Sequence, residues 1–117
     1  MTKISGDINC FAGLTKLEAI IIWQTQVSGN VKAFNNHQFL RVIDVPATAI
    51  SGDIAGLTNL PVLSDCSLHS TKIIGDISVF ANKTNLRYLD VNYTQVSGSV
   101  NSFTNNTKLV RLTVNNS

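Results

Sequence analysis

The stretch Leu86-Arg-Tyr-Leu89-Asp-Val91-Asn-Tyr-Thr94-Gln-Val96-Ser-Gly98-Ser-Val100 carries the pattern that decides the fold. The same pattern occurs five times in the 117 residues, once every 23 residues. Its most regular marker is a glycine column: Gly6, Gly29, Gly52, Gly75 and Gly98. A fixed period of about 20 to 50 residues is the signature of a repeat protein, in which each copy is one structural unit stacked on the next.

Six apolar columns keep the phase of the glycines. In the fourth copy they are Ile73, Ile77, Phe80, Leu86, Leu89 and Val91. All thirty positions, six columns in five copies, are apolar, although apolar residues make up only 44% of the chain. No single copy could bury these side chains alone, so we expect a continuous core between stacked coils. End-coil side chains such as Leu109, Leu112 and Val114 would touch water, which predicts either a longer array or self-association through uncapped ends.

The segment Leu86-x-x-Leu89-x-Val91-x-x-Thr94-x-Val96 resembles the leucine-rich repeat, with Thr at the usual Asn position. The Ser-Gly-x-Ile/Val that follows resembles the plant-type repeat without its proline. The threonine column (Thr25, Thr48, Thr71, Thr94, Ser117) makes the repeats more similar to those of bacterial surface proteins. The resemblance covers residues 4–117 and implies one domain, 1–117, of five repeats: 4–26, 27–49, 50–72, 73–95 and 96–117.

The resemblance implies a repeat solenoid, a right-handed coil or horseshoe segment. Its concave face would be a parallel β-sheet, and its convex arc would hold turns and short 3-10 segments. Alternation within Leu86–Val91 places Leu89 and Val91 inward and Tyr88 and Asp90 outward. We expect each column threonine to hydrogen-bond the backbone of adjacent coils. We expect each column glycine to have a positive φ or a close approach between coils.

The outward strand positions change from copy to copy while the inner columns stay constant. We call these fifteen positions the variable strip: Ala19, Ile21, Trp23, Val42, Asp44, Pro46, Asp65, Ser67, His69, Tyr88, Asp90, Asn92, Arg111, Thr113 and Asn115. A constant scaffold with a changing outer strip suits recognition of another macromolecule. The predicted partner-binding residues are Ile21, Trp23, Val42, Asp44, Asp65, His69, Tyr88, Asp90 and Arg111. Trp23 and Tyr88 are the favoured anchors, although preceding chain could cover Trp23 and Tyr88 could simply be solvated.

Other chemistries find little support. Asp65, Ser67 and His69 resemble a catalytic set, but alternate strand positions are about 6.6 Å apart, too far for the hydrogen bonds of a triad. We therefore predict no enzyme, no catalytic residue and no cofactor. The column Asp7, Asn30, Asp53, Asp76 and Ser99 is expected to cap turns rather than bind a metal. His37 is expected on the solvated surface, and Cys66 as a small buried hydrophobe that does not pair with Cys10.

Composition narrows the partners. The net charge is +2 and only 14% of the residues are charged, so we expect no nucleic acid. The apolar runs are too short to span a bilayer, and because the first repeat follows Met1 directly we expect no signal peptide. Two functions follow. The first is a binding module for a protein, or alternatively for a glycan. The second is a structural spacer or assembly segment of a longer surface protein. As part of a longer chain the domain is expected to be extracellular or at the cell surface, whereas a native start at Met1 would predict a cytoplasmic location.

Overall fold

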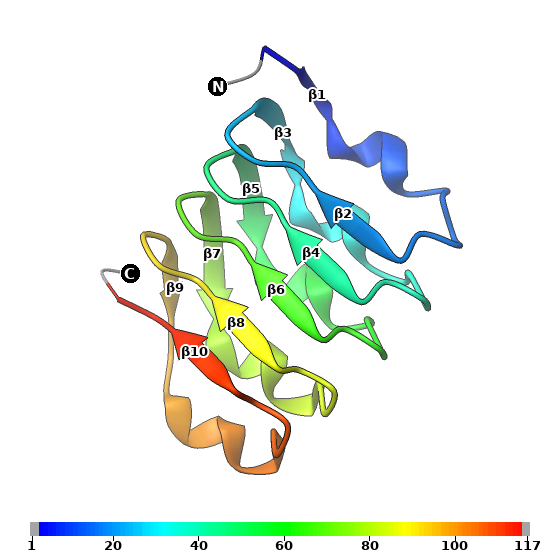
Figure 1. Ribbon diagram of the computed structural model, residues 1–117. Helices are drawn as coiled ribbons and strands as arrows, with labels where there is room; N and C mark the ends of the chain where they lie inside the picture. Colours follow the sequence, from blue (N-terminus) through cyan, green and yellow to red (C-terminus); the bar gives the residue numbers. More distant parts are fainter. Residues whose placement is uncertain (1–2, 116–117) are drawn as a thin grey trace.

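The computed structural model describes residues 3–115, and it consists of five stacked coils. Each coil contains a strand, a 3-10 helix and a second strand (Figure 1). The first strands are β1 (Ser5–Asp7), β3 (Gln26–Asn30), β5 (Ala49–Asp53), β7 (Lys72–Asp76) and β9 (Gln95–Ser97). The 3-10 helices are η1 (Ile8–Phe11), η2 (Val31–Phe34), η3 (Ile54–Leu57), η4 (Ile77–Asn82) and η5 (Val100–Asn105). The second strands are β2 (Ala19–Ile21), β4 (Val42–Asp44), β6 (Asp65–Ser67), β8 (Tyr88–Asp90) and β10 (Arg111–Thr113).

The predicted parallel sheet is present as β2-β4-β6-β8-β10. Its register follows the repeat: Ile43 pairs with Cys66, and Cys66 with Leu89, each 23 residues further on. These inward residues are at most 2% exposed. The strand predicted over Leu86–Val91 is therefore centred correctly, and the fold is a leucine-rich repeat solenoid.

A second parallel sheet, β1-β3-β5-β7-β9, was not predicted from the sequence. Strands β1, β3, β5 and β7 include the column glycines, and β9 ends one residue before Gly98. Because the coils repeat in register, any extended segment lies beside its own copies and pairs with them. Gly29 (φ +117°) and Gly75 (φ +123°) confirm the predicted positive φ. A Cβ on Gly75 would lie 2.8 Å from Ile54 Cγ1, so the close coil approach is confirmed as well.

The 3-10 helices start where the sequence predicts caps. Asp7, Asn30, Asp53, Asp76 and Ser99 each accept a hydrogen bond from the backbone N–H two residues later, over 2.8–3.1 Å. This confirms the capping interpretation of the column. The carbonyl-to-amide bonds of a 3-10 turn then bring the chain round to the next strand.

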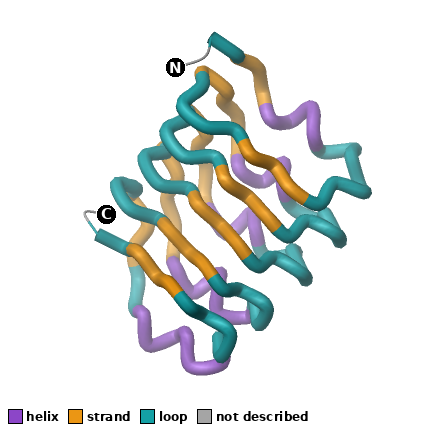
Figure 2. The backbone as a smooth tube through the Cα atoms, viewed as in Figure 1, coloured by secondary structure: helices purple, strands orange, loops and turns teal. Residues whose placement is uncertain are grey.

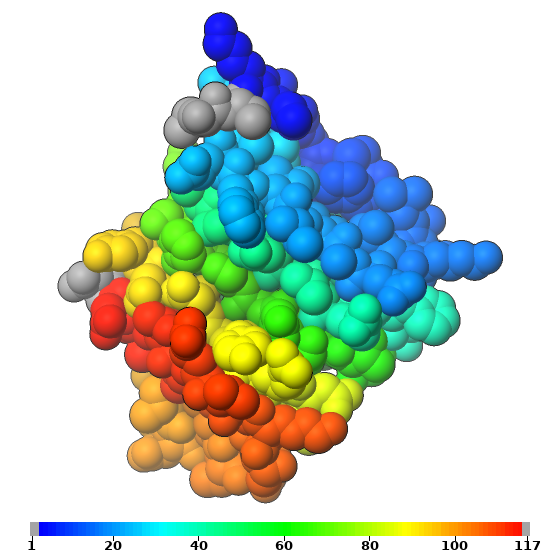
Figure 3. All heavy atoms as spheres, viewed as in Figure 1, coloured from blue at the N-terminus to red at the C-terminus, as the bar shows by residue number. Residues whose placement is uncertain are grey.

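The core lies between the two sheets and the row of 3-10 helices (Figure 2). Successive coils appear as successive bands in the space-filling view, each against its neighbours (Figure 3). Ile43, Leu63 and Ile73 are at most 1% exposed. Leu109, Leu112 and Val114 in the last described coil are only partly buried, as expected for an end coil.

The threonine column points into the turn but does not join adjacent coils as we expected. Thr48, Thr71 and Thr94 each donate a hydrogen bond to the backbone carbonyl three residues earlier, over 2.7–3.0 Å, within the same coil. The inward-pointing hydroxyl reaches the end of its own strand before it reaches a neighbour. Ser117, the fifth member of the column, lies outside the described residues.

The prediction that His37 is a solvated surface residue is wrong. His37 is 1% exposed, and its Nε2 lies 2.9 Å from the Phe11 carbonyl oxygen of the preceding coil. The positions 23 residues apart form a column: Leu14, His37, Leu60, Lys83 and Asn106. Asn106 Nδ2 donates in the same way to the Phe80 carbonyl, over 3.0 Å. Polar members of this column join neighbouring arcs, which is why they are buried although they are not apolar.

Candidate functional site

The variable strip forms three rows across the β2–β10 sheet. In the first row Val42, Asp65, Tyr88 and Arg111 stand side by side in register. In the second row Ile21, Asp44, Ser67 and Asp90 do so. The third row, Trp23, Pro46, His69, Asn92 and Asn115, follows directly after the strands. The constant period therefore gathers side chains from different repeats onto one surface.

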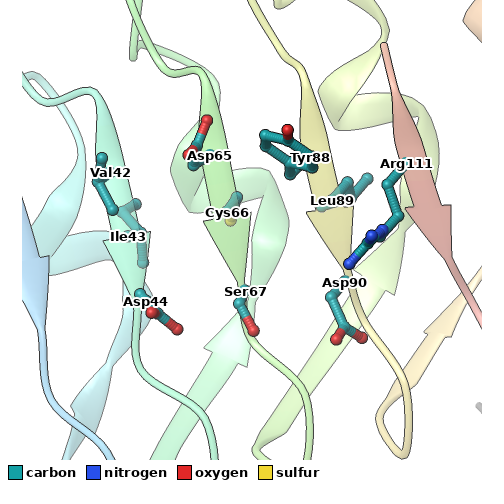
Figure 4. Close-up of a pocket in the computed structure, with 10 residues that line it drawn as sticks. All are labelled: Val42, Ile43, Asp44, Asp65, Cys66, Ser67, Tyr88, Leu89, Asp90 and Arg111. Carbon is teal, nitrogen blue, oxygen red and sulfur yellow. The ribbon is translucent and has the colours of Figure 1, made fainter.

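A hollow of about 250 Å³ lies over the middle of this sheet. Figure 4 shows the side chains of the first two rows around it, with Arg111 extending from β10 toward β8. Its lining includes six of the nine predicted partner-binding residues: Val42, Asp44, Asp65, Tyr88, Asp90 and Arg111. Ile43, Cys66 and Leu89 line its floor.

The charges of the hollow are mainly negative. Arg87 Nε lies 3.8 Å from Asp65 Oδ1, and the Arg87 guanidinium carbon stands 5.0 Å from the centre of the Tyr88 ring. Asp65 Oδ1 is nevertheless buried without a hydrogen bond to any residue in the described part of the chain. Asp90 Oδ1 accepts a hydrogen bond from the Asn92 backbone, over 3.0 Å. The cation that faces these carboxylates from within the hollow's own lining is Arg111.

A second hollow, of about 340 Å³, lies at the end of the strands in the third row. Its lining is Trp23, Gln24, Asp44, Pro46, Ala47 and His69. Trp23, Asp44 and His69 were predicted as partner-binding residues, and this hollow brings them together. Asp44 lines both hollows and so joins them.

Backbone hydrogen bonds beyond the strands hold the third row in place. Gln24, Ala47 and Ser70 adopt φ values of 52° to 58°, a left-handed conformation that non-glycine residues rarely take. Their N–H groups donate to the carbonyls of Pro46, His69 and Asn92 in the next coil, over 2.9–3.1 Å. These bonds continue the interstrand spacing of the sheet beyond the last residues of its strands.

The remaining predicted residue, Ile21, is 61% exposed and pairs in register with Asp44, but it lines neither hollow. Sequence reasoning missed Arg87, Gln24 and Ala47. Arg87 lies within the predicted strand Leu86–Val91 but was not counted among its outward positions, whereas its side chain lies beside Asp65 and Tyr88. Gln24 and Ala47 lie where the strip was thought to end, and only their backbone conformation brings them to it.

The site holds no reactive thiol. Burial raises the pKa of the Cys66 thiol to about 12, and nearby Lys83 lowers it only in part. Cys10 is exposed and free. Among residues 3–115, no group of three or more His, Cys, Asp or Glu side chains is arranged to hold a metal ion. In the same range, no helix has the length and apolar character needed to cross a membrane.

Comparison with known proteins identifies similar solved structures. No protein-family model and no curated protein matches the chain. The plant peptide hormone receptor RGFR1, solved in complex with RGF2, is similar to 98% of the chain at 26% identity, with a TM-score of 0.83. Internalin C2 from Listeria monocytogenes covers 97% at 22% identity and a TM-score of 0.79. The leucine-rich repeat ectodomain of the receptor kinase SOBIR1 from Arabidopsis thaliana covers 97% at 23% identity and a TM-score of 0.72.

The chain spans 19%, 51% and 62% of the lengths of these three proteins, respectively. Their descriptions agree with the leucine-rich repeat fold built above from the coils and the register. They include plant receptors as well as a bacterial internalin, so the expectation of a bacterial surface repeat stays a prediction.

Proposed function

Because the chain has the leucine-rich repeat fold, we propose that its variable strip is a binding surface for a protein ligand. The observation that carries the proposal is the hollow over β4, β6, β8 and β10, whose lining comes from four adjacent coils. Residues that lie 23 positions apart in the chain, such as Asp65 and Tyr88, act there as one surface. The variation of these positions over constant inner columns supports recognition rather than scaffolding alone.

The similar proteins support the same class of function. One is a peptide hormone receptor solved with its ligand, and another is the ectodomain of a receptor kinase. We propose an extracellular or cell-surface location on the same grounds. The polar lining also suits a glycan, which therefore remains an alternative ligand class, but Tyr88 and Arg111 are residue types that protein interfaces favour.

Selection from a random peptide library displayed on phage tests the proposal. Selected peptides are measured against wild type, Tyr88→Ala and the matched control Tyr93→Ala. Tyr88 lines the hollow, whereas Tyr93, the other tyrosine of the chain, lies in a turn and is 61% exposed. We expect Tyr88→Ala to weaken binding about tenfold or more, Tyr93→Ala to stay within about twofold, and the melting temperature of Tyr88→Ala to stay unchanged.

Equal effects of the two tyrosine substitutions, or a library without a selectable binder, would contradict a binding function of the strip.

A second candidate function, assembly through an end coil, is favoured by one observation. Val110 is 72% exposed in the last described coil and Leu14 is 49% exposed in the first. Light scattering over a concentration series tests it: self-association that Val110→Lys abolishes would favour assembly.

A further inference from the structure

We propose that the hollow beside Trp23 takes the side chain of a basic residue, arginine or lysine, of the ligand. This inference rests on the proposed function, since it assigns one feature of the ligand that the variable strip binds. It concerns the second hollow, which is lined by Trp23, Asp44, Pro46 and His69 together with Gln24 and Ala47. An aromatic wall and a carboxylate in one depression are the two groups that a cation on an aliphatic stem requires.

Trp23 supplies the aromatic wall. Its side chain is 58% exposed, and within residues 3–115 it contacts neither a cation nor another ring. By contrast, the half-buried ring of Tyr88 already carries the guanidinium of Arg87. A tryptophan face attracts a cation more strongly than a tyrosine or phenylalanine face. Trp23 is therefore the strip aromatic that is free to receive a cation from outside.

Asp44 supplies the countercharge. Asp65 is within 3.8 Å of Arg87, and the carboxylate of Asp90 accepts a hydrogen bond from Asn92. Asp44 has neither kind of partner among the residues that the structure describes. A carboxylate without a partner, at the edge of an apolar depression, gains most from a ligand cation because the depression excludes part of the competing water.

The net charge of the strip decides between a basic and an acidic occupant. Its three carboxylates, Asp44, Asp65 and Asp90, face one cationic position, Arg111, at the opposite end of the sheet. An acidic side chain entering beside Trp23 would meet Asp44 with no cation in the lining. A purely apolar side chain would fit the rings of Trp23 and Pro46 but would bury the Asp44 carboxylate without compensation.

The backbone holds these groups ready for a ligand. Gln24 N–H donates to the Pro46 carbonyl over 3.1 Å, and Ala47 N–H donates to the His69 carbonyl over 3.0 Å. These bonds fix the three coils that contribute to the hollow against one another. A preformed site loses less entropy on binding than one that must be assembled.

The test uses three capped tripeptides as probes: Ac-Gly-Arg-Gly-NH2, its neutral isostere with citrulline, and Ac-Gly-Leu-Gly-NH2. Trp23 is the one tryptophan of the chain, so its fluorescence and its indole N–H signal in NMR report on this hollow directly. We expect the arginine peptide to perturb Trp23 with a dissociation constant on the order of millimolar. The citrulline and leucine peptides should bind at least about fivefold more weakly.

Asp44→Asn should weaken the arginine peptide about five- to tenfold and remove the dependence of its binding on salt. Asp53→Asn is the matched control. It removes the same charge from the far sheet, and Asn30 performs the same capping role in the preceding coil. Equal binding of the arginine and citrulline peptides, tighter binding of the leucine peptide, or an unchanged affinity of Asp44→Asn would overturn the proposal.

The two levels of the proposal fail in different ways. If library-selected peptides depend on Tyr88 but the arginine peptide does not perturb Trp23, the strip binds a ligand and only the basic-residue assignment is wrong. If the selected peptides ignore Tyr88, the proposed function itself is wrong, whatever the tripeptides show.

Discussion

Replacing Lys83 by leucine is expected to stabilise the protein. Lys83 is 4% exposed, and its ammonium donates one hydrogen bond, to the Thr58 carbonyl over 3.2 Å. Within the described residues no carboxylate lies in an ion pair with it. The same column holds Leu60 one coil earlier, also buried, so the space accepts leucine. Removing a poorly compensated buried amine recovers about 1–3 kcal/mol, and the lost bond to Thr58 costs about 1 kcal/mol.

We therefore expect Lys83→Leu to raise the free energy of unfolding by up to about 2 kcal/mol at pH 7. Urea titration followed by far-UV circular dichroism measures it. Lys108→Leu is the control, because Lys108 is exposed and bonds only to Asn85 Oδ1 over 3.0 Å among the described contacts. Its effect should stay within about 0.5 kcal/mol.

The stability advantage of Lys83→Leu over the wild type should also depend on pH. Burial lowers the pKa of the Lys83 ammonium from its usual 10.5, so between the lowered pKa and 10.5 the unfolded chain binds more protons than the folded one. Wild-type stability therefore rises with pH in that window, and the advantage of Lys83→Leu shrinks. Cys66, whose pKa burial raises from 9.0 to about 12, acts in the opposite direction above pH 9. Lys83 itself lowers the Cys66 pKa, so the two proteins are compared in a Cys66→Val background, where their difference isolates Lys83. A less stable Lys83→Leu, or an advantage that stays constant from pH 7 up to 10.5, would refute the reasoning.

Three further predictions concern the coils and the thiols. Ser70→Gly should raise the free energy of unfolding by about 0.5–1 kcal/mol in urea titration, because φ is 58° there and glycine relieves the left-handed strain; a lower value would show that the turn is unstrained. Gly75→Ala should lower the free energy of unfolding by about 2–3 kcal/mol, since φ is +123° and the new Cβ would meet the preceding coil. The control Gly13→Ala, with open space at its Cβ, should change the free energy of unfolding little. At pH 8 a disulfide reagent should modify exposed Cys10 rapidly and Cys66 only after unfolding, because burial raises the Cys66 pKa to about 12; rapid modification of two thiols in the folded protein would contradict this.

The period predicted most of the core, because burial in a solenoid is repeated coil by coil. It failed where a column mixes apolar and polar residues. Leu60 and Lys83 occupy the same buried position, and the sequence gives no apolar regularity to reveal it. The deciding feature is an acceptor carbonyl on the preceding arc, such as that of Thr58, which only the assembled stack brings within reach. The second sheet was missed for a related reason: glycine and asparagine in Gln26–Asn30 have low strand propensity, and the pairing comes from the neighbouring copies.

The site shows the same division between what periodicity predicts and what only the fold supplies. Alternation within each strand predicted that Asp44 faces outward, and the register with Ser67 and Ile21 follows from the period. The position of Trp23 relative to Asp44 does not follow, because Trp23 lies beyond the strand, where alternation no longer applies. It depends on the left-handed turn at Gln24, whose N–H reaches the next coil. If that turn orients the indole, Gln24→Gly should keep the fluorescence response of Trp23 to the arginine peptide. Gln24→Pro should lose this response although Asp44 remains in place, because proline lacks the N–H and cannot adopt a positive φ.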